Sequence, residues 1–160
     1  MNLYNKKILS PKKTYYLVIF FIIILCDYIS KKLIIKNLVE YEFKKIIPML
    51  NIIHLHNYGG AFNVLSNRNI WTFLYFIFTN ILIILILLYK TYISIKNNNK
   101  NYISYLFIIS GSFSNLIDRI NHGFIIDFID LYIKNYHFAT FNIADVSIIT
   151  GIILFIKTLI

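Results

Sequence analysis

The sequence predicts an all-α integral membrane protein: four transmembrane helices with a small extracytoplasmic segment that contains β-structure. Hydrophobic residues make up 58% of the chain and charged residues only 14%, whereas soluble domains carry about 25% charged residues. Four apolar stretches follow one another without an internal repeat or a linker, and a spanning helix needs about 20 residues. With 160 residues in all, we expect one membrane domain over residues 1–160.

The spans are expected at about 14–35, 70–89, 101–119 and 138–157. The second stretch is uncharged throughout, the third is uncharged up to Ile117, and the fourth contains one charge, Asp145, up to Ile156. The first apolar run ends at Cys26 and is too short to cross about 30 Å of hydrocarbon. This helix must therefore continue past Asp27.

The N-terminus could instead be a cleaved signal peptide, with a basic region formed by Lys6, Lys7, Lys12 and Lys13. A cleavage site needs small residues at the end of the apolar run. Leu25, Cys26 and Asp27 stand there instead, which favours a retained helix.

The segment between the first and second spans, residues 36–68, is expected to be structured. Within residues 47–65 it mixes β-forming side chains with the pair Gly59-Gly60. This mixture favours short strands that lie on the membrane surface.

The formal charge of +9 is interpreted as membrane orientation, not nucleic-acid binding, because the basic residues flank apolar runs. Lysines at the N-terminus, between the second and third spans and at Lys157 place both termini in the cytoplasm. Residues 36–68 and 121–137 then lie outside. The basic residues of the first outer segment oppose this orientation: Lys36, Lys44, Lys45 and Arg68.

Polar residues recur at helical spacing near the expected outer ends of three spans. They are Asp27 with Lys31, then Asn115 with Asp118 and Arg119, then Asn142 with Asp145. Spacings of three and four residues place each set on one helix face. Such groups can simply hold helices together, but carboxylates within a membrane protein more often mark a functional site.

Asp127 and Asp145 are 18 positions apart, so a short return loop can bring their carboxylates together. Two close carboxylates share a proton, and one then acts as a base toward water while the other acts as an acid. This is the chemistry of aspartic proteolysis.

The other possible nucleophiles and metal ligands are weaker candidates for the reactive site than the two aspartates. Cys26 is the single cysteine, lies in an apolar run and is interpreted as inert core packing. His54 and His56 have strand spacing but are too few for a metal site. His122 and His137 are interpreted as interfacial polar residues. We therefore expect no metal and no other cofactor.

Taken in order, these motifs resemble those of the bacterial lipoprotein signal peptidase family, signal peptidase II. The matching segments within residues 27–151 are Asp27-Tyr28-Ile29-Ser30-Lys31, Asn57-Tyr58-Gly59-Gly60-Ala61-Phe62, Asn115-Leu116-Ile117-Asp118-Arg119, Ile126-Asp127-Phe128 and Phe141-Asn142-Ile143-Ala144-Asp145. The resemblance implies an aspartic endopeptidase of the bacterial cytoplasmic (inner) membrane, with its active site near the outer face. It would cleave prolipoproteins just before a diacylglyceryl-modified cysteine, so its partners would be those substrates and membrane lipid, without nucleic acid.

The resemblance also implies roles for single residues. Asp127 and Asp145 match the catalytic pair. The residues implied to line the substrate site are Asn57, Asn115, Arg119 and Asn142, and those implied to support its geometry are Asp27, Lys31 and Asp118. This sequence departs from the family pattern at Gly60, Asn63 and Ser114. Asp130 matches no motif and is interpreted as solvated or supporting.

Two other classes of function remain as alternatives. A small proton-coupled transporter or channel subunit could use the same carboxylates as a proton relay. Such a relay should cross the membrane, whereas the second span is purely apolar. If the protein were a structural assembly factor, there would be no reason for the polar residues of three spans to lie at the same depth in the membrane.

Overall fold

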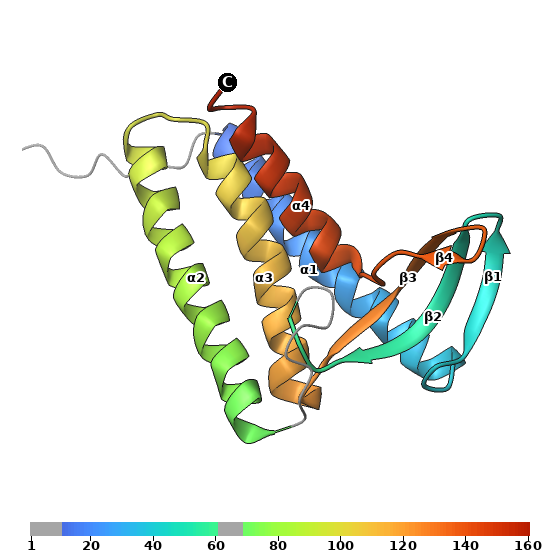
Figure 1. The fold of residues 1–160 in the computed structure, drawn as a ribbon. Coiled ribbons are helices and arrows are strands. Elements are labelled where there is room, and N and C mark those ends of the chain that lie inside the picture. Colours follow the sequence, from blue (N-terminus) through green and yellow to red (C-terminus); the bar gives the residue numbers. More distant parts are fainter. Residues whose placement is uncertain (1–10, 61–68) are drawn as a thin grey trace, which may run out of the picture.

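The computed structural model describes residues 11–60 and 69–160, and within them four helices lie beside a four-stranded antiparallel sheet (Figure 1). The elements in chain order are α1 Pro11–Asn37, β1 Phe43–Ile47, β2 Leu50–Asn57, α2 Ile70–Lys96, α3 Tyr102–His122, β3 Ile125–Ile133, β4 Tyr136–His137 and α4 Ile143–Ile156. The four expected helices are thus present. Several residues used above fall outside the described part: Lys6, Lys7, Ala61, Phe62, Asn63, Arg68 and the side chains of Lys12 and Lys13.

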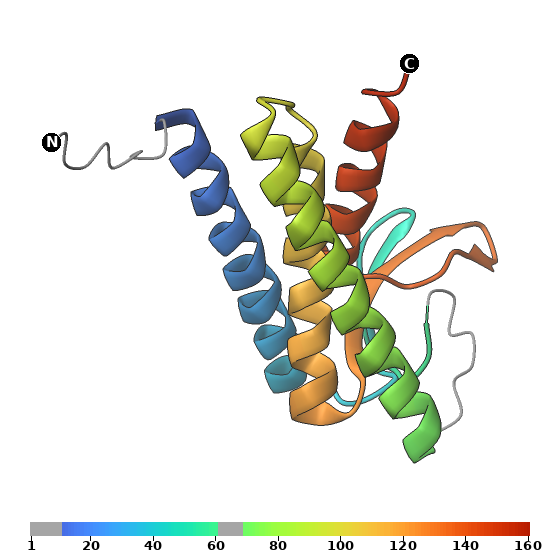
Figure 2. The ribbon, with the colours of Figure 1, turned by 90° about the vertical axis from the view of Figure 1, so that its left-hand side faces the viewer.

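Helix α3 is the centre of the helical layer, because α1, α2 and α4 all pack against it (Figure 2). A small core forms where Ile84 of α2 meets Ile109 and Leu116 of α3. Within the described residues, α2 is the one helix that is both long and apolar enough to cross a membrane, and α4 is a shorter apolar helix of 14 residues. Most of α2 is exposed, as expected for a helix that faces lipid.

The helix boundaries differ from the expected spans in one informative place. The fourth helix begins at Ile143, not at residue 138, because Asn142 has extended backbone and caps it. Residues before the cap approach the sheet instead, where Phe141 bridges to Ile129. Helix α1 is longer than expected by three residues at its start and two at its end. Helix α2 is longer by seven residues and α3 by three residues at their C-terminal ends.

The sheet contains a strand that the sequence analysis did not predict. The strands predicted within residues 47–65 are present as part of the β1–β2 hairpin, which begins earlier, at Phe43. Strand β3, in the stretch taken for a return loop, pairs antiparallel with β2 and brings Asp127 opposite Leu55. The sheet order is β1-β2-β3-β4, so a central strand carries this carboxylate.

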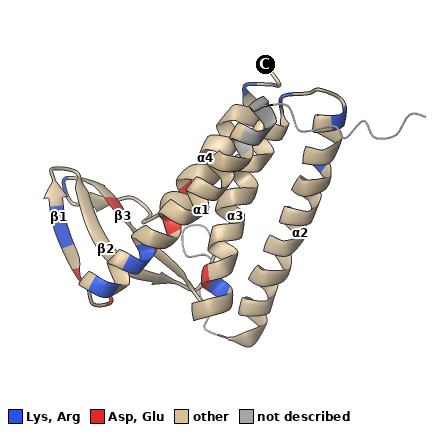
Figure 3. Ribbon diagram, turned by 180° about the vertical axis from the view of Figure 1, so that it is seen from behind, with Lys and Arg blue, Asp and Glu red and all other residues tan. Residues whose placement is uncertain are grey.

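Charged residues gather at the two ends of the helices and near the sheet (Figure 3). The long middle part of α2 carries none, since its only charged residues are Lys90 and Lys96. Cys26 is exposed on α1, so its assignment to the core was wrong. Lipid tails are as apolar as the side chains around Cys26, so an exposed position on this helix fits a face turned toward lipid.

Helices α3 and α4 approach closely because glycines lie at their contact. A Cβ atom at Gly111 would lie 2.2 Å from the backbone oxygen of Ala144, and one at Gly151 would lie 2.7 Å from that of Ser104. Between them the hydroxyls of Ser110 and Ser147 are 3.1 Å apart. Small residues of this kind let helices in a membrane pack backbone to backbone.

Replacing Gly111 by Ala should therefore force α3 and α4 apart and lower the free energy of unfolding by about 1–3 kcal/mol, the usual cost of overpacking. Gly111→Val should cost more, while Phe113→Leu on the exposed side of the same helix should cost little. Thermal denaturation in detergent would measure the series. A Gly111→Ala variant as stable as wild type would contradict the close packing.

Candidate active site

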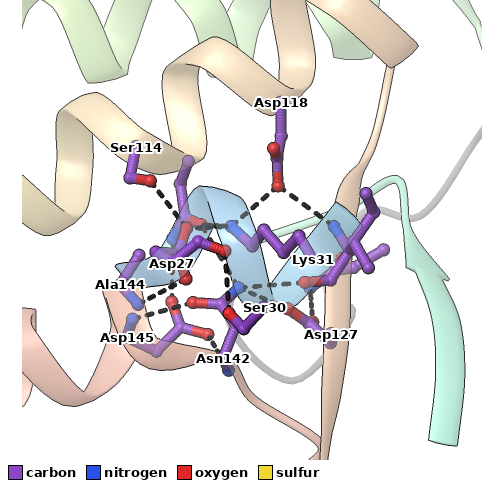
Figure 4. Close-up of polar contacts among 12 residues, drawn as sticks. Asp27, Ser30, Lys31, Ser114, Asp118, Asp127, Asn142, Ala144 and Asp145 are labelled. Atoms are coloured by element: carbon purple, nitrogen blue, oxygen red, sulfur yellow. Dashed lines mark hydrogen bonds and ion pairs between the residues drawn. The ribbon is translucent and has the colours of Figure 1, made fainter. Parts of the chain in front are cut away.

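Asp127 and Asp145 come from different elements, β3 and α4, and one residue, Asn142, contacts both carboxylates. The Asn142 amide donates to Asp127 Oδ1 at 2.7 Å, and the Asn142 backbone N–H donates to Asp145 Oδ2 at 3.2 Å. Figure 4 shows the three residues together beneath α1. The structure thus brings the two predicted carboxylates to one place.

The position of Asp145 follows from how α4 begins. Asn142 is the N-cap, its Oδ1 accepts the Asp145 N–H at 2.9 Å, and Asp145 returns a carboxylate oxygen to the Asn142 N–H. This reciprocal arrangement is a capping box. A local helix-start signal therefore fixes the carboxylate, and the three-residue spacing seen in the sequence reflects this cap.

Asp127 is almost completely buried and is held from both sides. Its Oδ2 accepts the Asn57 amide of β2 at 2.9 Å, opposite the bond from Asn142. Burial raises the pKa of Asp127 to about 7, and the neighbouring Asp145 carboxylate acts in the same direction, whereas the two amide donors oppose the shift. Asp127 therefore retains a proton close to neutral pH.

The Asp145 carboxylate also accepts a hydrogen bond from a residue of α3. The Asn115 amide donates to Asp145 Oδ1 at 2.8 Å, and the Asn115 oxygen accepts from Asn142 at 3.2 Å. Among residues 11–60 and 69–160, each carboxylate oxygen of the pair accepts one hydrogen bond. A carboxylate oxygen has two lone pairs, so it can also accept from a further partner such as a water.

Behind the carboxylates lies a buried ionic cluster (Figure 4). The Lys31 ammonium is 2.6 Å from Asp27 Oδ2 and 2.7 Å from Asp118 Oδ2. It also donates to Asn115 Oδ1 at 3.1 Å. Lys31 and Asp27 are 2% and 0% exposed, so the three supporting residues expected from the resemblance form one cluster that reaches Asp145 through Asn115.

Asp27 connects this cluster directly to the start of α4. Its Oδ1 accepts the Ala144 N–H at 2.9 Å, and its Oδ2 accepts the Ser114 hydroxyl at 2.6 Å. A carboxylate near free N–H groups at a helix N-terminus is stabilised by the helix dipole. Ser114, noted above only as a departure from the family pattern, thus has a structural contact in this chain.

Arg119 and Asn57 hold the segment that leaves β2. The Arg119 guanidinium donates to the Gly59 carbonyl at 2.7 Å and lies over the Phe76 ring, 5.0 Å from its centre. The Gly59 N–H donates to Asn57 Oδ1 at 3.0 Å. Both residues were expected to line the substrate site, and they hold the backbone that borders Asp127.

The remaining polar residues lie elsewhere. Asp130 is buried in the sheet, bonded to Asn51 and His137, so it is not solvated. His54 contacts the Leu38 carbonyl at 2.9 Å and His56 at 3.0 Å. The first contact ties β2 to the residue that follows α1, and the second lies within β2. Neither is a contact with Asp127 or Asp145.

Comparison with known proteins now identifies the family. The family model for signal peptidase (SPase) II matches residues 19–160. The chain belongs to the signal peptidase II family. It is 49% identical to a lipoprotein signal peptidase of Buchnera aphidicola subsp. Schizaphis graminum, over 91% of this chain and 96% of that protein. It is 38% identical to one of Serratia proteamaculans, over 81% of this chain and 77% of that protein.

The fold matches as well. A bacterial membrane enzyme solved by the in meso method at 2.3 Å resolution is 31% identical, with a TM-score of 0.80, over 91% of this chain and 87% of that chain. These findings confirm the resemblance and, with it, a membrane protease that removes signal peptides from prolipoproteins. They do not favour a transporter.

Lys31→Met should strongly destabilise the protein, because Asp27 and Asp118 would remain buried without their cation. Breaking a buried ion pair in this way typically costs about 3–5 kcal/mol. Lys32→Met, at the exposed neighbouring position, is the matched control and should be nearly neutral. Denaturation in detergent would measure both variants, and equal stability of the two would contradict the cluster.

Stability should also fall as pH rises from about 4 to about 7. The folded pKa of Asp127 is raised from 3.8, so in that window the folded state binds a proton that the unfolded state has lost. The loss corresponds to on the order of 4 kcal/mol at most. Asp127→Asn should flatten this part of the pH–stability curve, and an unchanged slope would contradict the raised pKa.

Proposed function

We propose that this chain is an aspartic endopeptidase, with Asp127 and Asp145 as its catalytic pair, that cleaves prolipoproteins before a diacylglyceryl-modified cysteine. The observation that carries the proposal is the joining of the two carboxylates by Asn142, at 2.7 and 3.2 Å. Each carboxylate comes from a rigid element and is fixed by two donors. Held in this way, the two carboxylates are pre-organised to bind and activate a water.

In the proposed mechanism a water bound by the pair attacks the carbonyl carbon of the scissile peptide bond. Asp145 takes a proton from that water as its oxygen bonds to carbon, and Asp127, which holds the shared proton, donates it to the carbonyl oxygen. The tetrahedral intermediate then breaks its C–N bond as the nitrogen gains a proton from Asp145, and the gem-diol returns its other proton to Asp127. Both carboxyl groups end as they began, and no metal or other cofactor is needed.

The proposal places the pair at the outer face of the bacterial inner membrane. All four helices would cross the bilayer as one membrane domain, and both termini would be cytoplasmic. Support comes from the charge distribution. The end of α2, its connection to α3 and the end of α4 lie away from the sheet (Figure 1), and these segments or the residues next to them contain Lys90, Lys96, Lys100 and Lys157. The carboxylates lie at the opposite level, where water reaches a bond at the membrane surface.

Asp127→Asn and Asp145→Asn should each abolish cleavage of a purified diacylated substrate while the protein stays folded, because one carboxylate alone lacks either the acid or the base. The double variant should lose little more, since groups that act as a unit are non-additive. Asp130→Asn is the matched control: it removes a buried carboxylate from the same strand and should retain turnover. Substantial cleavage by either single variant would rule out the pair.

The lipid on the substrate should matter for binding. Each buried methylene contributes about 0.8 kcal/mol, so a peptide without its diacylglyceryl group should be cleaved very poorly at equal concentration. Cleavage rates of the two peptides in the same detergent would measure the difference. Equal rates would contradict the substrate assignment without affecting the carboxylate pair.

A further inference from the structure

A groove of about 410 Å³ lies between α1 and α3, apart from the two active-site carboxylates. Its lining comes from two elements: Phe21, Ile24, Leu25 and Tyr28 of α1 with Ser114, Ile117 and Asp118 of α3. Its surface is almost entirely apolar. Neither Asp127 nor Asp145 lines it, and nothing in the mechanism above uses it.

One wall of the groove is the back of the ionic cluster. Ser114 is bonded to Asp27, and Asp118 is bonded to Lys31. Water in the groove would raise the local dielectric constant and weaken these charge contacts, whereas a hydrocarbon chain would keep it low. The groove therefore needs an apolar occupant for the cluster to remain strong.

The open side of the groove suits a lipid. Phe21, Leu25 and Tyr28 are 66%, 56% and 44% exposed, and their spacing of four and three residues puts them in one row along α1. One turn beyond Tyr28 the row becomes basic. The exposed Lys32 ammonium lies 4.9 Å from the centre of the Tyr28 ring, and Lys36 follows four positions later.

We propose that this groove binds an acyl chain of an anionic phospholipid from the surrounding membrane, with the Lys32 ammonium on its headgroup phosphate. The apolar row takes the chain, and the charge at its end selects an anionic headgroup. The substrate's own acyl chains are a poorer match, because the contacts Asp118–Lys31–Asn115 stand between the groove and Asp145.

A tryptophan reporter tests the apolar part of the site. The chain has one tryptophan, so Trp71→Phe combined with Leu25→Trp places a single reporter at the groove. Ile29→Trp in the same background is the control, since Ile29 is exposed on α1 but does not line the groove. Phosphatidylglycerol brominated on its acyl chains should quench the groove reporter at a several-fold lower mole fraction than brominated phosphatidylcholine, while the control reporter should not distinguish them.

The charge is tested by Lys32→Gln, which should remove the preference for phosphatidylglycerol, and by Lys44→Gln on β1, which should retain it. The wild-type protein gives a second measurement: native mass spectrometry should detect bound phosphatidylglycerol that Lys32→Gln loses. Equal quenching by both lipids, or a preference that survives Lys32→Gln, would overturn the proposal. So would displacement of phosphatidylglycerol by a brominated diacylated substrate peptide, which would assign the groove to substrate.

Discussion

The structure around the two carboxylates, Asp127 and Asp145, depends on one buried cation, the ammonium of Lys31. Bringing a charge out of water costs several kcal/mol, which is recovered only when partners surround it closely. Here Asp27 of the same helix and Asp118 and Asn115 of α3 supply those partners. Since Asp27 also binds the first turn of α4, the ion contacts fix three helices relative to one another.

This cluster explains why the carboxylate pair can be held without a large hydrophobic core. The buried apolar set between α2 and α3 is small, and most of the α2 surface faces outward. Within a membrane, hydrocarbon outside the protein gives apolar side chains little reason to turn inward, so polar contacts and close helix packing hold helices together. Gly111 and the Lys31 cluster provide these two kinds of contact along one face of α3, and Ala144 of α4 meets both.

Asn142 shows how one residue serves both fold and site. As N-cap it decides where α4 begins, and the same side chain donates to Asp127 on the sheet. Its amide also donates to the Ile126 carbonyl at 3.3 Å. The start of α4 and strand β3 are thus fixed relative to each other, and both carboxylates are held by contacts with one residue.

Much of this arrangement follows from the sequence. The apolar runs predicted four helices, and the spacing of Asp27 with Lys31 placed them on one helix face, where the structure has an ion pair. The role of the site residues in catalysis stays a prediction. Three features did not follow: the sheet position of Asp127, the late start of α4 and the exposure of Cys26.

The physical reasons for those misses differ. Residues 125–133 are rich in Ile, Phe and Tyr, and this composition favours a strand. The segment lies between two apolar helices and is therefore interpreted, from the sequence alone, as their connecting loop. Strand pairing between residues about 75 positions apart is a long-range choice that local patterns do not encode. For Cys26, an apolar run does not tell which face is buried when lipid and protein are equally apolar.

The raised pKa of Asp127 follows from its place in the fold and bears on its proposed role as an acid. A carboxylate that reached a fully hydrated surface would ionise near pH 4 and could not act as an acid near neutral pH. Placing Asp127 on a central strand, under α1 and beside Asp145, buries it enough to hold its proton to about pH 7. Strand β3, which local patterns in the sequence did not predict, is therefore the element that gives the proposed catalytic pair a carboxyl group able to hold a proton near neutral pH.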